Sequence, residues 1–200
     1  PDPDLVEQAA AMLASAEAPA LYLGRGAADA ADLLVDLAEQ LGAPVTTSFS
    51  GKGVFPESHP LWLWCGFGRQ APKFVRGIMS KCDCLLALGC RFGEVTTAGY
   101  GIDPPPNLIH VDIDPEVFNR NFAAKLAIPA DARLFVQALG TLIEFAETES
   151  RPGLRTGAGR LYAALYAVEL ACEMLALGDP HPGVFDLLHN ALTRLSQPDA

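Results

Sequence analysis

The sequence predicts an α/β fold: a doubly wound, Rossmann-like parallel sheet of about six strands, with a C-terminal helical tail. Two patterns favour this fold. Short apolar segments alternate with helical segments of about 10–15 residues up to residue 148, as in consecutive βαβ units. The short segments are apolar almost throughout, which is typical of strands that helices cover on both faces.

The first elements are two helices and one strand. Residues 4–17 carry apolar side chains at helical spacing, and Pro19 ends that helix. Residues 20–23 form an apolar strand that breaks at a glycine. Residues 29–41 show a second helical stripe, and Gly42 suits the end of a helix.

The middle of the chain continues the alternation. Residues 44–47 are rich in β-branched side chains and begin the next strand. Trp62 and Trp64 lie near the third crossover and are expected in the core or at an interface. A helix fits residues 72–81, and an apolar strand follows at residues 84–88.

The last elements of the domain follow a rigid turn of three prolines at residues 104–106. A strand is predicted at residues 107–112, and Pro115 suits the first position of a helix. Residues 127–128 suit a short final strand, and residues 132–147 a closing helix.

The chain therefore divides into a domain at residues 1–148 and a tail at residues 149–200. The tail begins with a loop rich in Gly, Arg and Pro and continues with helical segments at 161–177 and 184–196. Because the first of these helices is apolar on nearly all sides, we expect it to be buried against the chain or in a homo-oligomer.

Composition limits the classes of partner. Asp and Glu number 24 against 14 Lys and Arg, a net charge of −10, which disfavours nucleic acid and anionic membranes. No apolar run is long enough to span a bilayer. The odd number of cysteines indicates reduced thiols in a cytoplasmic protein. The start, PDPDLVEQ, has no Met and no signal peptide, so we expect a segment from inside a longer protein.

The first candidate site follows the strand at 20–23, because ligands of open α/β sheets bind beyond the carboxyl ends of strands. Gly24 and Gly26 would let the backbone approach a phosphate, and Arg25 could add a charge to a diphosphate. The alternative is a plain tight turn, since Asp29 occupies the third glycine position of the GxGxxG motif.

The residues at two other strand ends indicate which kind of ligand the sheet would bind. Arg91 follows the strand at 84–88, where a guanidinium suits a phosphate or an aromatic ring; the alternative is a surface ion pair. The strand at 44–47 ends in Thr46 and Thr47, without the acid that would hold the ribose of NAD.

His110, Asp112 and Asp114 would share one face of a regular strand and could then hold a divalent ion. Asp114 has a simpler role as the N-cap of a helix that begins at Pro115. Asp112 then lies at the strand end, where a carboxylate can accept hydrogen bonds from ribose hydroxyls. No metal ligands are assigned.

Several motifs occur together in one order: APALYLGRGA, LAEQLGAPVTTSFSGKGVFPESHPLWLWCGFG, CDCLLALGCRFGE and NLIHVDIDPEVFNRNFAAKLAIPADA. Over about residues 5–147 the chain resembles the central domain of thiamine-diphosphate-dependent enzymes of the acetolactate synthase group. The segment HPGVFDLLHNALTRLSQPDA resembles the helix that introduces the diphosphate-binding domain of these enzymes.

The resemblance implies a part of an enzyme that decarboxylates a 2-oxo acid and transfers the product to an acceptor, a transferase or a lyase. In that family, other domains supply the activating glutamate and the motif that holds Mg²⁺ and thiamine diphosphate. Neither is in this chain, so we expect no catalytic residue here, and the missing N- and C-terminal domains are the expected partners.

In some members of the family this domain binds FAD or ADP. The resemblance assigns the diphosphate to Gly24, Arg25 and Gly26. It places Arg91 along the nucleotide, with Thr46, Thr47 and Gly66 nearby. It assigns the adenosine to Asp112 and Ile113, assisted by Asp131. Two departures, Gly93-Glu94-Val95 and Thr96-Thr97-Ala98, weaken the case for FAD and leave an adenine nucleotide such as ADP.

Two other functions stay open. The domain could have a structural role with no bound nucleotide, as in other relatives. It could also be a free-standing NAD-binding domain on a similar sheet, as in the sirtuin or deoxyhypusine synthase group, although the absent ribose acid counts against this.

Overall fold

The computed structural model describes the backbone of residues 1–150 and the side chains of residues 1–143. The tail was predicted at 149–200, and all of it except residues 149–150 lies outside the described residues. The helices predicted at 161–177 and 184–196, from which a homo-oligomer was inferred, therefore also lie outside them.

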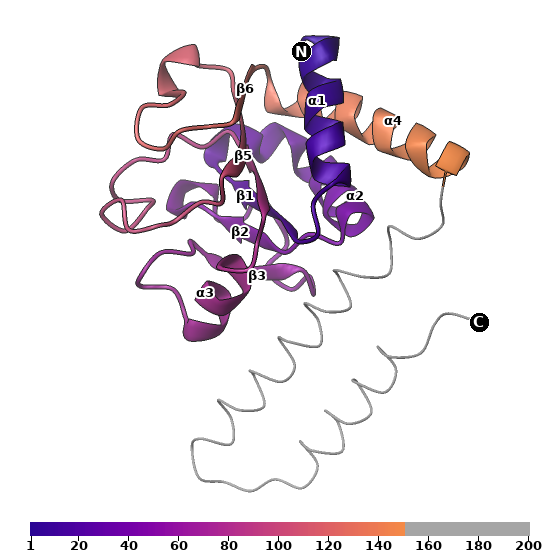
Figure 1. The fold of residues 1–200 in the computed structure, drawn as a ribbon. Helices are drawn as coiled ribbons and strands as arrows, with labels where there is room; N and C mark the ends of the chain where they lie inside the picture. The colour runs from indigo at the N-terminus through magenta and orange to yellow at the C-terminus, as the bar shows by residue number, and fades with distance from the viewer. Residues whose placement is uncertain (151–200) are drawn as a thin grey trace, which may run out of the picture.

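Six parallel strands form one sheet in the order β3-β2-β1-β4-β5-β6. The strands are β1 (Pro19–Leu23), β2 (Val45–Thr47), β3 (Trp62–Cys65), β4 (Cys84–Leu88), β5 (Asn107–Asp112) and β6 (Leu126–Pro129). Strand β1 lies near the centre of the sheet, and β2 and β3 follow it outward to one edge. The chain then returns to the centre, where β4, β5 and β6 build the other half (Figure 1). This order confirms the predicted doubly wound sheet, with its switch point between β1 and β4.

Helices cover both faces of the sheet. The α-helices are α1 (Pro3–Ala14), α2 (Ala31–Leu41), α3 (Lys73–Met79) and α4 (Ala132–Ser150), and the 3₁₀-helices are η1 (Arg25–Ala30), η2 (Phe49–Gly51) and η3 (Pro115–Val117). Helices α1, α2 and α4 pack on one face, and α3 lies on the other (Figure 1).

The strands divide their side chains between two cores. In β1, Leu21 and Leu23 join the core beneath α1, α2 and α4, whereas Ala20 and Tyr22 join the core beneath α3. Every residue of β1 is buried, because successive side chains point to opposite, covered faces. This explains why the strands are apolar throughout.

Four predicted helices are shorter than expected. Helix α2 begins at Ala31 and not at residue 29, because η1 precedes it, and α3 covers Lys73–Met79 of the predicted 72–81. Helix α1 ends at Ala14 with Ser15 as its cap, and Pro19 begins β1 instead of ending the helix. The helix predicted at Pro115 is only the single 3₁₀ turn of η3, because the backbone at Phe118 is already extended. The helix end at Gly42 is confirmed by its left-handed φ of 58°.

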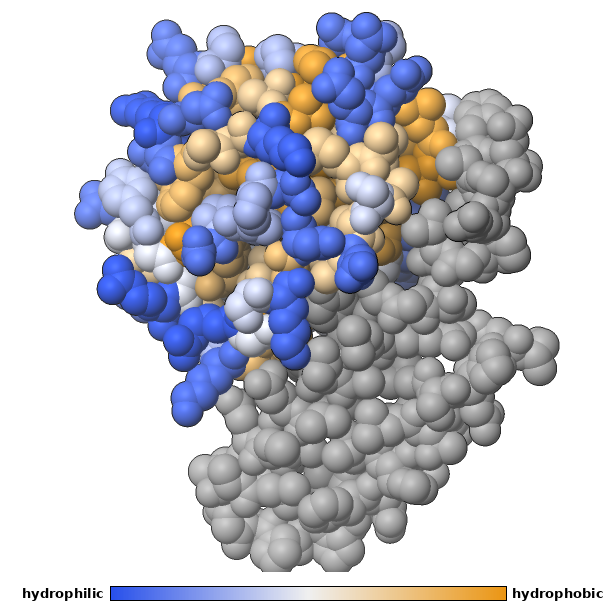
Figure 2. Space-filling view, viewed as in Figure 1, coloured by the Kyte–Doolittle hydropathy of each residue, from blue (hydrophilic) through white to orange (hydrophobic). Residues whose placement is uncertain are grey.

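Strand β3 forms one edge of the sheet beside β2. Trp62 packs at the margin of the core, as expected, whereas Trp64 is 42 % exposed. On the face shown in Figure 2, hydrophilic residues lie along the margin and in a band down the middle, with weakly hydrophobic residues on both sides of that band. Among the described helices, none has the length and hydropathy needed to cross a bilayer.

Candidate functional site

The turn after β1 and the turn after β4 are in direct backbone contact at the switch point. Gly24 N donates to Leu88 O at 2.9 Å, and Gly26 N donates to Gly89 O at 3.2 Å. A Cβ atom on Gly24 would lie 2.0 Å from Gly89 O, and one on Gly26 would lie 2.8 Å from Gly89 Cα. Contact between the two turns therefore requires both glycines, whether or not a ligand binds.

A crevice of about 650 Å³ opens beside this junction. Its walls come from β1 and from the segments that follow β1, β2, β4 and β5, at the carboxyl edge of the sheet. The lining residues are Tyr22, Arg25, Gly26, Ser48, Ser50, Gly89, Cys90, Arg91, Phe92, Gly93, Thr96, Asp112 and Ile113. The crevice is therefore where an open α/β sheet places its ligand.

Two arginines predicted from the sequence, Arg25 and Arg91, line the crevice from neighbouring turns. Both are exposed, and neither belongs to an ion pair among the described residues. The surface ion pair considered for Arg91 thus has no partner in the described part of the chain. The two guanidinium groups are available to an anionic ligand.

Asp112 and Ile113 line the crevice from the end of β5. Asp112 as a whole residue is only 7 % exposed, and its Oδ1 accepts a hydrogen bond from Asp114 N at 3.0 Å. Asp114 Oδ1 in turn accepts from Glu116 N, which makes Asp114 the N-cap of η3, as predicted.

His110 does not join these carboxylates. Its Nε2 donates to Cys90 O at 2.7 Å, and its ring packs edge-on against Phe92 and Phe118 with centroids 5.0 Å away. Within the described residues, no group of three His, Cys, Asp or Glu side chains is placed to hold a metal ion.

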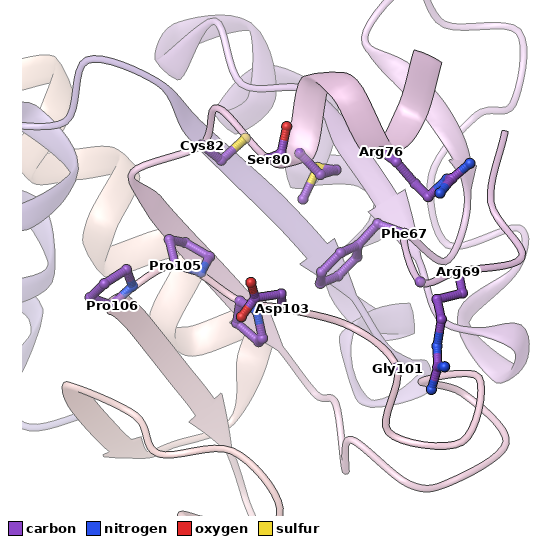
Figure 3. A pocket seen from close by; sticks show the side chains of 12 residues that line it. Phe67, Arg69, Arg76, Ser80, Cys82, Gly101, Asp103, Pro105 and Pro106 are labelled. Carbon is purple, nitrogen blue, oxygen red and sulfur yellow. The ribbon is translucent and has the colours of Figure 1, made fainter. Parts of the chain in front are cut away.

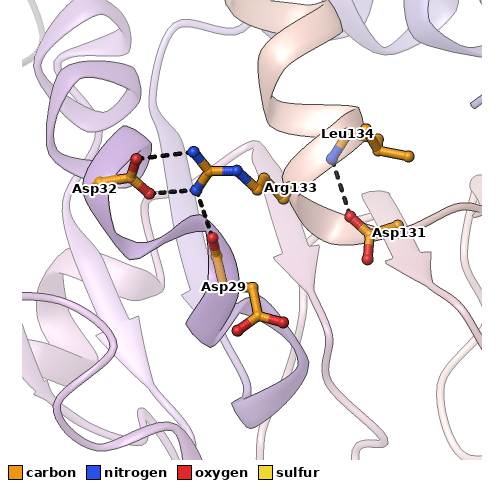
Figure 4. Close-up of polar contacts among 5 residues, drawn as sticks. All are labelled: Asp29, Asp32, Asp131, Arg133 and Leu134. Carbon is orange, nitrogen blue, oxygen red and sulfur yellow. Dashed lines mark hydrogen bonds and ion pairs between the residues drawn. The ribbon is translucent and has the colours of Figure 1, made fainter.

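The other predicted residues do not line the crevice. Gly24 lies in the turn junction described above. Thr46 and Thr47 are fully buried, and Gly66 N donates to Thr47 O at 2.7 Å. Asp131 Oδ1 accepts a hydrogen bond from Leu134 N at 3.0 Å at the start of α4 (Figure 4). Each has a structural role, and contact with a ligand stays a prediction for all of them.

Several lining residues were not predicted as site residues. Ser48 follows β2 directly and Ser50 lies in η2, just beyond it, so their position beyond a strand end could have identified them. Tyr22 lies within β1, and its hydroxyl donates to Thr96 O at 3.0 Å. No local signal in the sequence marks that tyrosine as part of a crevice.

Two buried residues of the crevice lining, Tyr22 and Cys90, are uncharged. Burial raises the pKa of the Tyr22 hydroxyl and of the Cys90 thiol, so both stay protonated at neutral pH. Cys90 Sγ donates to Tyr22 O at 3.2 Å. Since the thiolate is the reactive form of cysteine, Cys90 is a packing residue and no nucleophile.

The loop after β4 contains three residues other than glycine in the left-handed region: Phe92, Ala98 and Tyr100, with φ of 48°, 54° and 58°. Thr97 Oγ1 donates to Gly93 O at 2.9 Å and accepts from Tyr100 N at 3.1 Å. These bonds hold a turn that a glycine would suit better at residue 98.

A second cavity of about 530 Å³ lies between α3 and the segment before β5. Phe67 projects toward its centre, Arg69 lies beside Gly101, and Arg76 extends from α3 (Figure 3). None of the residues predicted from the sequence as site residues lines it. It is also separate from the switch point.

The chain matches two family models. One, described as "Thiamine pyrophosphate enzyme, central domain", matches residues 6–139. The other, "Recombination protein O C terminal", matches residues 155–200, which lie outside the described residues.

Curated relatives include acetolactate synthases. The chain is 37 % identical over 131 residues to a "Probable acetolactate synthase large subunit" of Methanocaldococcus jannaschii, covering 64 % of this chain and 22 % of that protein. It is 34 % identical to "Acetolactate synthase 1, chloroplastic" of Zea mays, covering 72 % and 23 %. It is 39 % identical to a "Sulfoacetaldehyde acetyltransferase" of Rhodobacter capsulatus, covering 66 % and 23 %.

A solved structure is similar as well. The crystal structure of benzoylformate decarboxylase from Polynucleobacter necessarius superposes with a TM-score of 0.59 at 25 % sequence identity, covering 71 % of this chain and 27 % of that one. In each of these comparisons the chain spans only about a fifth to a quarter of the other protein's length.

Proposed function

The chain belongs to the family of thiamine pyrophosphate enzyme central domains, and we propose that it serves within an enzyme of acetolactate synthase type. Such an enzyme would decarboxylate a 2-oxo acid and transfer the product to an acceptor. Thiamine diphosphate, held with Mg²⁺ by other domains, supplies the carbanion chemistry when bound. The acetolactate synthases among the relatives support this parent.

Within that enzyme, the crevice at the switch point binds an adenine nucleotide, ADP or the ADP part of FAD. The observation that carries this proposal is the convergence of Arg25 and Arg91, both without an ion pair among the described residues, in one crevice with the carboxylate of Asp112. Guanidinium groups suit phosphates, and a carboxylate suits ribose hydroxyls.

Each end of the nucleotide has a counterpart in the crevice. Arg25 meets the diphosphate near the β1 turn, and Asp112 accepts hydrogen bonds from the ribose near the end of β5. Ile113 is 73 % exposed and lines the crevice, so its side chain offers an apolar surface to the adenine ring. Arg91 lies between these two ends.

The phosphate contact depends on side chains more than on the glycine backbone. Gly26 N already donates to Gly89 O, so this amide is not free to bind a phosphate. The diphosphate is therefore held mainly by guanidinium groups, which form strong charge-assisted hydrogen bonds with phosphate oxygens.

The main rival is a structural domain with no bound nucleotide. The contact between Gly24 and Gly89 favours it, because it explains the glycines of the β1 turn without a ligand. A free-standing NAD-binding domain is less well supported, since β2 ends in Thr47 and not in an acid. Within the described residues, Cys65, Cys84 and Cys90 form no disulfide, which agrees with a reducing compartment such as the cytoplasm, where we place the parent.

The first experiment asks what the purified chain carries. After denaturation, absorbance and mass spectrometry of the released small molecules are expected to reveal ADP or FAD, or titration of the empty chain is expected to show ADP binding. Absence of both would favour the structural rival. Calorimetry with thiamine diphosphate is expected to show no binding, because the domains that hold it are the parent's other domains.

A further inference from the structure

A smaller cavity of about 330 Å³ adjoins the crevice. We call it the side lobe; it is lined by Arg91, Gly93, Tyr100, Asp114, Val117, Arg120 and Asn121. Arg91 and Gly93 line both the side lobe and the crevice, so the two hollows meet at the loop after β4. None of the residues predicted for the nucleotide lines the side lobe, apart from Arg91.

A hydrogen bond joins the segments that carry the two arginines of the side lobe, Arg91 and Arg120. Asn121, which follows Arg120, donates through Nδ2 to the carbonyl of Phe92, which follows Arg91, at 2.9 Å. On the other side of Arg120, Asn119 adopts a φ of 57° and accepts Ala124 N at 2.8 Å through Oδ1. Arg120 is thus held between two anchored asparagines and beside the Arg91 loop.

The positive charges of the side lobe are not neutralised within the described residues. Arg91 and Arg120 belong to no ion pair there. The one carboxylate of the lining, Asp114, accepts Glu116 N at 3.1 Å through Oδ1 and belongs to no ion pair there, so two guanidinium groups face a single negative charge and the lining keeps a net positive charge. Two guanidinium groups at one small cavity repel each other unless an anion lies between them. In a chain of net charge −10, such a pair points to an anionic ligand.

We propose that the side lobe is a binding site for a phosphate monoester, held by Arg91 and Arg120. The neighbouring crevice indicates which molecule carries this phosphate: the adenine nucleotide. This step rests on the function proposed above. Asp112, the ribose partner, lines the crevice, and Asp114, two residues on, lines the side lobe. A phosphate on the 2′ or 3′ oxygen of the ribose would therefore enter the side lobe, which selects ribose-phosphorylated adenine nucleotides.

The test compares nucleotides that differ only in this phosphate. AMP, adenosine 2′,5′-bisphosphate and adenosine 3′,5′-bisphosphate are titrated into the full chain by calorimetry at fixed ionic strength. One of the bisphosphates is expected to bind about tenfold tighter than AMP. Arg120→Ala removes that gain and leaves the affinity for AMP unchanged. The control, Arg76→Ala, removes an equal charge from α3, outside both hollows, and keeps the gain.

A second measurement does not depend on the nucleotide. Inorganic phosphate is added to the ¹⁵N-labelled chain, and it is expected to shift the signals of the Arg120 side chain and of the Asn121 amide. If no nucleotide binds but phosphate shifts these signals, phosphate binding at the side lobe is supported and the proposed nucleotide function is contradicted. If phosphate shifts neither signal, or if the bisphosphate gain is absent from the wild type or persists in Arg120→Ala, the side lobe does not select ribose phosphates.

Discussion

Gly24 and Gly89 are in backbone contact so close that a Cβ atom on Gly24 would lie 2.0 Å from the carbonyl oxygen of Gly89. Gly89 itself has a φ of 59°, and it donates through its own amide to Val111 O at 2.9 Å. The turns after β1 and β4, together with the end of β5, are thus locked to one another. This junction forms the rigid wall from which Arg25 and Arg91 reach the crevice.

Gly24→Ala should destabilise the domain by about 1–3 kcal/mol or more, because the added carbon overpacks the junction and neither backbone can move freely. Chemical denaturation monitored by circular dichroism measures the effect. Gly140→Ala is the matched control: a Cβ atom there meets nothing within 4 Å, and replacing glycine inside a helix should stabilise the chain by about 0.5–1 kcal/mol. Equal stability of the two variants would contradict the account of the junction.

His110 should make the domain less stable in mild acid. Burial lowers the pKa of its imidazole, and its Nδ1 is buried without a hydrogen-bond partner among the described residues. The unfolded chain therefore binds the proton more readily than the folded chain. The free energy of unfolding should be unaffected above about pH 6.5 and should fall below it, until the pH reaches the lowered native pKa.

This slope should be smaller in His110→Gln, measured by denaturant unfolding between pH 7 and pH 5 (approximate limits set by the ordinary histidine pKa). Because that variant also loses packing against Phe92 and Phe118, an NMR titration of the wild-type imidazole provides a second readout. An imidazole that protonates in the folded domain at its ordinary pKa would contradict the prediction.

Arg133 joins α4 to α2 through Asp32: Arg133 Nη2 donates to Asp32 Oδ2 at 2.9 Å, and Arg133 Nη1 also donates to Asp29 O (Figure 4). Hydrogen bonding from Arg133 lowers the pKa of Asp32. The stabilisation is therefore complete above the unfolded pKa, about pH 4, and is lost as the pH falls through the lowered native value. Asp32→Asn should flatten this part of the acid unfolding profile, and the effect should weaken at high salt.

Ala98→Gly should stabilise the loop after β4. Ala98 has a φ of 54°, which costs an L-residue roughly 1–2 kcal/mol and costs glycine little. Part of that gain is offset by the greater freedom of glycine in the unfolded chain. We expect a rise in the midpoint of thermal unfolding, measured by calorimetry. Gly53→Ala, in which φ is 87° and the space is open, should lower that midpoint for the same backbone reason.

Much of the sheet could be predicted because its strands are buried on both faces. The bounds of the strands at 84–88 and 107–112 were predicted as β4 and β5 have them, since apolar runs bounded by Gly, Pro or a carboxylate allow few alternatives. Strand β3 was not placed, because it lies at the sheet edge and mixes exposed with buried residues. The helix at Pro115 stops after one turn, where the backbone at Phe118 becomes extended. The loop that follows is bonded to Phe92 through Asn121, a contact between distant segments that the local sequence does not reveal.

The site was predictable only where a residue follows a strand. Arg25, Arg91 and Asp112 stand at strand ends, and the structure brings them to one crevice. Arg120 stands on a loop, and nothing in its local sequence indicates that Asn121 holds it beside Arg91. Likewise, whether a threonine such as Thr47 faces the ligand or the core depends on how the strand is packed.

The nucleotide-binding crevice is tested most directly by titrating ADP into the wild-type chain and into Arg25→Ala, with Arg76→Ala as the charge-matched control. If Arg25 holds the diphosphate, its removal should weaken ADP binding by roughly 10- to 100-fold. The thermal unfolding of the nucleotide-free domain should stay nearly unchanged, because Arg25 is exposed and has no ion pair among the described residues. Equal affinity of the wild type and Arg25→Ala, or no binding of ADP to the wild type, would contradict the central claim.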